Sequence, residues 1–147
     1  MKNLLITLLV VMASCGEKQE RKEGPMKPER ALTEEMELSG SYVLAQLKSE
    51  EITSEDISLK IDEDRKEVMG NAGCNRFSAF YERDGNDINF QEPASTKMYC
   101  EGKMEREKEV INLFSEITGV QKDGEYIVFS SENGDPVFRA KKTKNRE

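Results

Sequence analysis

Residues 70–78, GNAGCNRFS, decide how this chain folds, because they predict a sharp corner between two strands. Gly70 and Gly73 flank the bend, where glycine permits either a positive φ angle or a close approach of two backbone segments. Asn75 either hydrogen-bonds its own loop or tolerates a left-handed conformation, and Phe77 supplies buried bulk. The simplest interpretation is a structural corner.

Residues 96–100, TKMYC, form the segment to which we expect this corner to be clamped. Two other interpretations stay open. One is a ligand or partner site made of polar groups gathered on this edge, namely Asn75, Arg76, Thr96 and Lys97. The other is a redox-active pair of Cys74 and Cys100, although their spacing is not that of a Cys-x-x-Cys redox motif.

Short segments with alternating or clustered apolar residues surround the corner and predict strands. They occupy residues 42–47, 57–61, 67–70, 76–81, 88–90, 119–122, 125–130 and 136–140. Polar turns separate them, and the most typical turn chemistry is found at residues 84–86 (DGN), 123–124 (DG) and 133–134 (NG). Strands joined by short turns favour antiparallel pairing.

Residues 103–118 change to a helical period. One face of the predicted helix carries Met104, Glu107, Val110, Ile111, Phe114 and Ile117. Gly119 stands where a left-handed cap would end the helix. A single helix covers one opening or one face of a curved sheet. The predicted fold class is therefore α+β: a strand-dominated, curved antiparallel sheet or partial barrel of about eight strands with one amphipathic helix.

The N-terminal residues have the layout of a bacterial lipoprotein signal. Residues 1–3 carry one positive charge, and the apolar run over residues 4–12 is about half of the ~20 residues that a permanent membrane span needs. Residues 12–15, MASC, resemble a lipobox in which the thiol of Cys15 is acylated, with Met where Leu is usual. The alternative is an ordinary cleaved signal followed by a chance cysteine.

These features predict the domain organisation and the location of the chain. We expect a signal peptide at 1–14, lipidated Cys15 with a flexible charged tether over 15–38, a domain over 39–141 and a polar tail at 142–147. Several acyl chains, palmitate among them, give stable anchoring where one would be marginal. The domain would then lie outside the cytoplasm in the cell envelope, anchored to a membrane, with the outer membrane favoured.

Composition excludes several classes of function. The net charge is −7 without a basic stripe, which argues against nucleic acid binding. The chain has no histidine, which excludes His-dependent zinc sites and Ser-His or Cys-His catalysis. The acidic residues at 62, 64 and 67 are interpreted as a solvated turn because they lack the pattern of a calcium loop. We therefore predict no catalytic residue, no metal site and no cofactor.

The chain has three cysteines, one in the predicted lipid signal and two in the predicted domain. With Cys15 assigned to lipid, Cys74 and Cys100 remain in a compartment where disulfides persist. A bridge between them would stabilise the fold by about 3–4 kcal/mol in the chain-entropy model. The alternative is two reduced, buried thiols that never meet.

Two motifs in order, Gly-x-x-Gly-Cys-Asn-x-Phe over residues 70–77 and Thr-x-Met-x-Cys over 96–100, resemble the signatures of the META domain, or HslJ-like, family. The predicted helix and closing hairpins follow in the family's order, so the resemblance spans residues 39–141. Tyr42 stands where many members have Trp, and Ala79 where many have Gly. The motif residues expected to be structural are Gly70, Gly73, Asn75, Phe77, Thr96 and Met98.

The resemblance implies an envelope-associated domain, often on a lipoprotein and sometimes linked to stress, with no established enzymatic reaction. The leading hypothesis is a monomeric, non-enzymatic envelope lipoprotein that supports envelope integrity or a stress response by binding a partner. Its partners would be the membrane, through the lipid, and an envelope protein or small ligand. The alternatives are a small-ligand carrier with an apolar cavity and a protein-inhibitor module.

Overall fold

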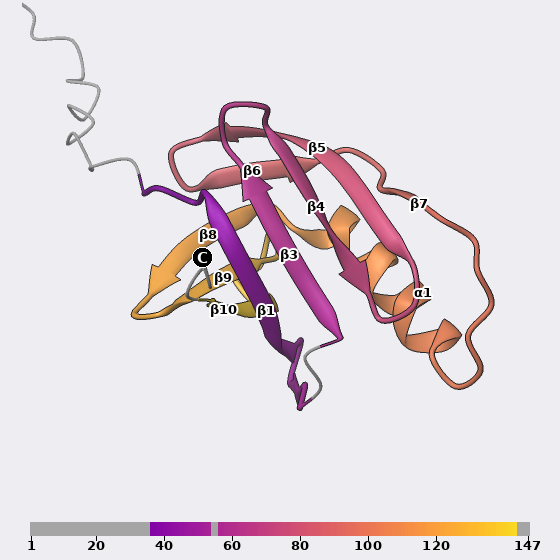
Figure 1. The fold of residues 1–147 in the computed structure, drawn as a ribbon. Coiled ribbons are helices and arrows are strands. Elements are labelled where there is room, and N and C mark those ends of the chain that lie inside the picture. The colour runs from indigo at the N-terminus through magenta and orange to yellow at the C-terminus, as the bar shows by residue number, and fades with distance from the viewer. Residues whose placement is uncertain (1–35, 54–55, 144–147) are drawn as a thin grey trace, which may run out of the picture. The chain divides into compact units, whose positions relative to one another are not determined.

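Alternating burial along successive strands builds one curved antiparallel sheet (Figure 1). The computed structural model describes residues 36–53 and 56–143, which lie in one compact unit of the chain. The predicted signal peptide, Cys15, most of the tether and residues 144–147 lie outside the described residues. The prediction of a strand-dominated curved sheet with one amphipathic helix is confirmed.

Eight strands of four or more residues form the sheet: β1 (Gly40–Leu47), β3 (Ile57–Asp62), β4 (Glu67–Ala72), β5 (Arg76–Asp84), β6 (Asp87–Phe90), β8 (Gly119–Asp123), β9 (Tyr126–Ser130) and β10 (Pro136–Lys142). The two-residue strands β2 (Glu50–Glu51) and β7 (Ala94–Ser95) were not predicted. The strand order is β10-β9-β8-β6-β5-β4-β3-β1-β2, β7 pairs with β5, and β10 also pairs with β1. The path of strands thus returns to its start, although β6 and β8 share only the pair Asp87–Gly119.

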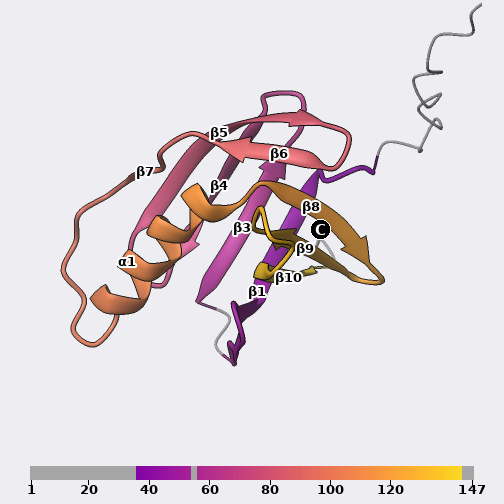
Figure 2. The same ribbon diagram turned by 180° about the vertical axis from the view of Figure 1, so that it is seen from behind.

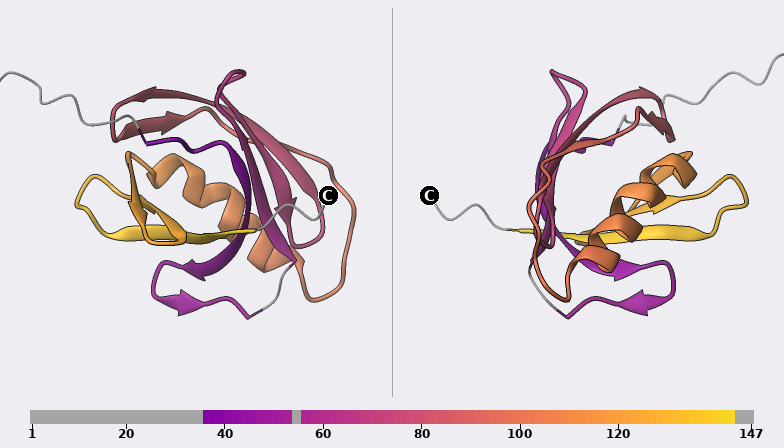
Figure 3. Two further views of the ribbon diagram at one scale, coloured as in Figure 1. Left: turned by 60° about the vertical axis from the view of Figure 1, so that its left-hand side comes forward. Right: turned by 90° about the vertical axis from the view of Figure 1, so that its right-hand side faces the viewer.

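The helix α1 (Met104–Leu113) lies on the concave side of the sheet and continues into a 3₁₀ turn, η1 (Phe114–Glu116) (Figures 2 and 3). Its buried residues include Glu107, Val110 and Leu113, and Phe114 follows them into the core. The convex side of β1, β3, β4 and β5 is covered by no helix or strand of the described residues (Figure 1). The helix therefore fills the inside of the curve and leaves the outside free.

Aromatic rings fill the space between helix and sheet. Phe114 is the centre of this cluster, with its ring centroid 5.1 Å from those of Phe77 and Phe90 and 5.3 Å from that of Phe138. Phe129 adds a further ring to the cluster at 5.8 Å from Phe90. Tilted and edge-to-face contacts of this kind are the favoured geometries for aromatic pairs. The core is thus a packed aromatic cluster.

Gly119 does not cap the helix, which corrects the prediction. The 3₁₀ turn η1 is followed by Ile117, whose backbone is extended. Gly119 is the first residue of β8, and its φ angle is not positive. A Cβ at Gly119 would come within 2.8 Å of Ser130 Oγ. Gly119 therefore leaves room for the Ser130 hydroxyl across the strand pair, which a Cβ would push aside.

The segment before β1 is fixed to the turn between β3 and β4. The Glu63 carboxylate accepts hydrogen bonds from the backbone N–H of Leu38 at 2.7 Å and of Ser39 at 3.2 Å. Its other oxygen pairs with Arg83 Nη1 at 2.6 Å, and the Arg83 side chain is almost completely buried. Leu38, which we placed at the end of the tether, is fully buried. Leu38 therefore packs with the core of the domain.

Gly70 lies within β4, and a side chain there would have no room. A Cβ at Gly70 would collide with the backbone carbonyl oxygen of Ser58 and come within 2.9 Å of the Phe77 ring. We expect Gly70→Ala to lower the free energy of unfolding by about 2–4 kcal/mol, because the backbone and a core ring must both shift. The measurement is urea denaturation at neutral pH.

The matched control for this prediction is Gly134→Ala. Gly134 has a φ of 84°, and no atom lies within 4 Å of the place that a Cβ would take, so the change introduces backbone strain without a collision. We expect it to cost about 1 kcal/mol. An equal loss in both variants would show that the space at Gly70 is not limiting.

The buried phenol of Tyr81 should make the stability of the domain depend on pH in the alkaline range. Burial, with a further contribution from the charge of Glu63, raises the pKa of Tyr81 from 10.0 to about 12. The unfolded phenol ionises first as pH rises above 10, so the free energy of unfolding should fall between pH 10 and about 12. Tyr81→Phe should make this decline shallower, leaving the contribution of Tyr42, whose pKa is also raised by burial. Urea denaturation at several pH values tests this, and parallel curves for the two proteins would contradict it.

Candidate functional site

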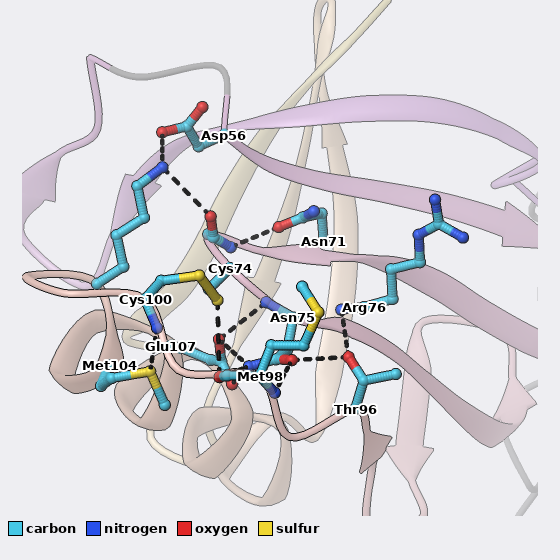
Figure 4. Close-up of a disulfide and its surroundings, with 12 residues drawn as sticks. Asp56, Asn71, Cys74, Asn75, Arg76, Thr96, Met98, Cys100, Met104 and Glu107 are labelled. Carbon is cyan, nitrogen blue, oxygen red and sulfur yellow. Dashed lines mark hydrogen bonds and ion pairs between the residues drawn. A yellow bond between two sulfur atoms is a disulfide. The ribbon is translucent and has the colours of Figure 1, made fainter.

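The corner predicted from residues 70–78 connects β4 to β5, and a disulfide joins it to the segment before α1 (Figure 4). Cys74 and Cys100 are bonded, with their Cα atoms 6.0 Å apart and a sequence separation of 26 residues. The predicted disulfide is therefore confirmed. It closes a loop whose constraint stabilises the fold by about 3–4 kcal/mol in the chain-entropy model.

Asn75 is the fully buried centre of this corner. Its side-chain Nδ2 donates to the Met98 carbonyl oxygen at 2.9 Å and to Glu107 Oε1 at 2.8 Å. Its Oδ1 accepts hydrogen bonds from Thr96 Oγ1 at 2.8 Å and from the Met98 N–H at 2.7 Å. An asparagine amide has two donor hydrogens and two acceptor lone pairs, so the side chain is completely satisfied.

The backbone of Asn75 is satisfied as well. Its N–H donates to Glu107 Oε2 at 2.9 Å, and its carbonyl oxygen accepts from the Ala72 N–H at 2.9 Å. No polar atom of Asn75 is left for a ligand. All the hydrogen-bonding groups of Asn75 are therefore used within the fold.

Glu107 was not predicted as a site residue, and it is the second half of the network. It is 6% exposed on the first turns of α1 and accepts hydrogen bonds from both the side chain and the backbone of Asn75. A buried carboxylate is tolerated when hydrogen bonds replace its water, and the helix N-terminus favours negative charge. The signal in the sequence was a charged residue on an otherwise apolar helix face.

Further contacts hold the two segments together around this network. Thr96 and Arg76 exchange bonds, with the Thr96 N–H donating to the Arg76 carbonyl oxygen at 3.0 Å and the Arg76 N–H to Thr96 Oγ1 at 3.3 Å. Lys103 Nζ lies 2.9 Å from Asp56 Oδ2 and 3.4 Å from the Gly73 carbonyl oxygen. The corner is thus bound to β5, to the segment before α1 and to the start of β3.

The other motif residues have structural positions too. Gly73 forms the bend with a φ of 114°, and its N–H donates to Asn71 Oδ1 at 2.8 Å. Phe77 is buried against Phe114, whereas Met98 contributes its backbone to the network and is itself 61% exposed. In the described part of the chain, no cluster of three His, Cys, Asp or Glu side chains is placed to hold a metal ion.

The structure divides the four residues of the predicted ligand edge into two pairs. The Thr96 hydroxyl donates a hydrogen bond to buried Asn75, although Thr96 itself is exposed. Arg76 and Lys97 are exposed, and no side-chain partner is found for either among the described residues. Figure 4 shows the Arg76 guanidinium directed away from the network. The arrangement therefore leaves the side chains of Arg76 and Lys97 exposed beside a corner whose Asn75 groups are all bonded.

The fold and the corner define a class of small, strand-dominated α+β domain with one inward helix and a disulfide-clamped β4–β5 corner. The family model that matches this chain is described as the META domain and covers residues 34–144. The chain belongs to the META domain family, as its two motifs indicated. No curated protein matches the sequence.

Solved structures with the same fold are distant in sequence. A protein from Burkholderia xenovorans, solved by NMR, is 23% identical over 72% of this chain and 79% of its own, with a TM-score of 0.52. A second NMR structure is 18% identical over 69% of this chain and 87% of its own, with a TM-score of 0.54. The crystal structure of a DUF4847 family protein from Bacteroides vulgatus is 12% identical over 73% and 94%, with a TM-score of 0.55. At these identities the similarity shows the fold alone.

Glu107→Gln tests whether the network carries stability. The new amide would place an N–H₂ group against the donors of Asn75, so at least one buried hydrogen bond is lost and two donors face each other. We expect the free energy of unfolding to fall by about 2–3 kcal/mol. Chemical denaturation with the disulfide intact is the measurement.

The control is Glu105→Gln, which makes the same chemical change on the exposed side of the same helix. We expect this variant to stay within about 0.5 kcal/mol of the unmodified protein. A comparable loss at both positions would mean that helix charge, and not the bonds to Asn75, accounts for the effect.

Proposed function

We propose that this chain is a membrane-anchored lipoprotein of the bacterial envelope whose META domain is a non-enzymatic binding module. The observation that supports a binding role is the contrast between the internally bonded Asn75 and the outward-facing residues beside it. The polar groups of Asn75 are all used internally, while Arg76, Lys97, Met98 and Tyr99 face outward beside it. A rigid corner that presents unpaired groups suits recognition of a partner, with envelope integrity or a stress response as the setting.

The packed core supports a surface binding role over an enclosed-ligand carrier. The space between sheet and helix is occupied by contacting aromatic rings, which leaves no room in that position for a buried ligand. A hollow of about 590 Å³ lies instead beside the start of β1, the end of β10 and the β8–β9 turn, and Gly40, Gly124 and Lys142 are among its lining residues. Binding at the surface is therefore the better-supported mode.

The lipid anchor is supported by residues 12–15, MASC, after a short apolar run. Within residues 36–53 and 56–143, no helix has the length and apolarity to cross a bilayer. Acylation at Cys15 would hold the domain at a membrane by burying hydrocarbon chains in the lipid. It would also account for the charged segment after Cys15 as a spacer between bilayer and domain.

The test is metabolic labelling of the full chain in a bacterial host with an alkyne analogue of palmitate, followed by membrane fractionation. We expect the unmodified protein to be labelled and recovered with membranes, and Cys15→Ser to lose both properties. The double variant Cys74→Ser/Cys100→Ser is the control, because it removes the disulfide and should keep the label.

Two results would contradict the proposal. Label that persists in Cys15→Ser, or an unmodified protein that is processed without being labelled, would contradict the anchor. Turnover of any substrate by the purified protein, with the turnover lost in Arg76→Gln, would contradict a non-enzymatic role.

A further inference from the structure

The convex face of β1, β3, β4 and β5 has a regular composition that follows from strand register. Cross-strand pairs share a face of the sheet, so Val43, Ser58, Asn71 and Arg76 form one outward row. Ser41, Lys60, Met69 and Ser78 form the next row. Small hydroxyl and amide side chains thus surround Met69. Arg76 stands at the end of the first row, and Lys60 stands beside Met69 in the second.

A groove of about 440 Å³ runs over this face. Its lining includes the two cations Lys60 and Arg76, the hydroxyl groups of Ser41 and Ser58, and the amide of Asn71. No aspartate or glutamate of the described residues lines it. This is an unusual environment in a chain whose 29 acidic residues exceed its 22 basic ones.

The two cations of the groove are available for a ligand. Lys60 and Arg76 are both exposed, and neither forms an ion pair with another described residue. Most other cations of the described chain are engaged, as Arg106 is with Glu50 and Arg139 with Asp123. Unpaired cations that line one groove are a charge pattern complementary to an anionic ligand.

We propose that this convex face is a docking surface for an acidic peptide segment of a partner protein. The inference rests on the proposed binding role and specifies the partner's chemistry. Arg76 lies on the second strand over from Lys60 and is shifted by two residues along that strand. This register places their Cα atoms roughly 12 Å apart. Four residues of an extended peptide cover about 13 Å, so carboxylates at positions i and i+4 reach both cations.

The chemistry of the groove favours a peptide over an anionic polysaccharide. Serine hydroxyls and an asparagine amide complement peptide groups, and Met69 supplies an adaptable apolar contact between them. The only aromatic residue in the lining, Tyr42, is itself 2% exposed, so the groove offers no open ring of the described residues to a sugar; the exposed ring of Phe80 lies outside it, beside Glu67 in the next row.

Acidic residues of the described sheet lie only beyond the groove. Asp62 and Glu67 form the next row along the sheet, where Glu67 lies 3.8 Å from Arg65 Nε and Asp62 accepts a hydrogen bond from the Arg65 N–H. Two residues along a strand span about 7 Å, so this row lies just within the screening length of about 8 Å at physiological ionic strength. Its contacts with Arg65 offset part of its repulsion, and Lys60 and Arg76, which line the groove itself, lie nearer to a bound carboxylate.

Fluorescence anisotropy with a labelled peptide of alternating Glu and Ser residues tests this proposal on the full chain in detergent. We expect saturable binding that weakens about tenfold or more in Lys60→Gln/Arg76→Gln. Binding should also weaken strongly in about 0.5 M salt. A peptide of alternating Gln and Ser residues should not bind.

The matched control is Lys108→Gln/Lys122→Gln, which removes the same charge from exposed cations on α1 and β8. We expect it to change the affinity by less than about twofold. Circular dichroism confirms that both double variants are folded. Equal weakening in the two double variants would overturn the proposal, because it would show a general charge effect.

Two further outcomes would also overturn it. One is the absence of binding to the acidic peptide, and the other is binding of heparin but not peptide at Lys60 and Arg76, which would assign the face to a glycan. Failure here is distinguishable from failure of the anchor. A chain that is acylated at Cys15 but does not bind the peptide overturns this inference alone, and a peptide-binding chain without lipid overturns the anchor alone.

Discussion

The hydrogen bonds between Asn75 and Glu107 are the interaction on which the rest of this domain depends. They join the β4–β5 corner to the first turns of α1, two parts of the chain that are 32 residues apart. Both groups are buried, so neither tolerates the loss of the other. A buried carboxylate without the amide donors, or an amide without its acceptors, would carry an uncompensated desolvation cost. The position of the helix inside the curved sheet is therefore specified by polar contacts as well as by aromatic packing.

The disulfide and the network act on different parts of the free energy of folding. The Cys74–Cys100 bond mainly restricts the unfolded chain, whereas the bonds of Asn75 select one native arrangement of the same segments. Because the disulfide holds the corner close to residues 96–100, less entropy remains to be lost when Asn75 binds the Met98 backbone. A directional network alone would have to order two long segments, and a disulfide alone would leave their relative orientation free.

Much of the fold could be predicted because its signals are local. Period-two alternation located the long strands, the Asp-Gly and Asn-Gly turns located the hairpins, and the helical stripe located α1. What failed depended on contacts between distant segments. Gly119 has the expected position for a cap but is the first residue of β8, where it lies opposite Ser130 in the β8–β9 pair. Glu107 was placed on the correct helix face, yet its partner lies in another element, and no local pattern names that partner.

At the candidate site, sequence alone could not show on which side of the sheet each polar side chain lies. Sequence proximity grouped Asn75 with Arg76, but adjacent residues at the start of a strand point to opposite sides of the sheet. The amide of Asn75 consequently enters the corner, while the guanidinium of Arg76 joins the outward row with Asn71 and Ser58. A motif residue that folds the domain and a residue free to bind can thus be neighbours in the chain. The Asn75 amide is used by the fold itself, whereas the neighbouring Arg76 guanidinium stays exposed on the convex face.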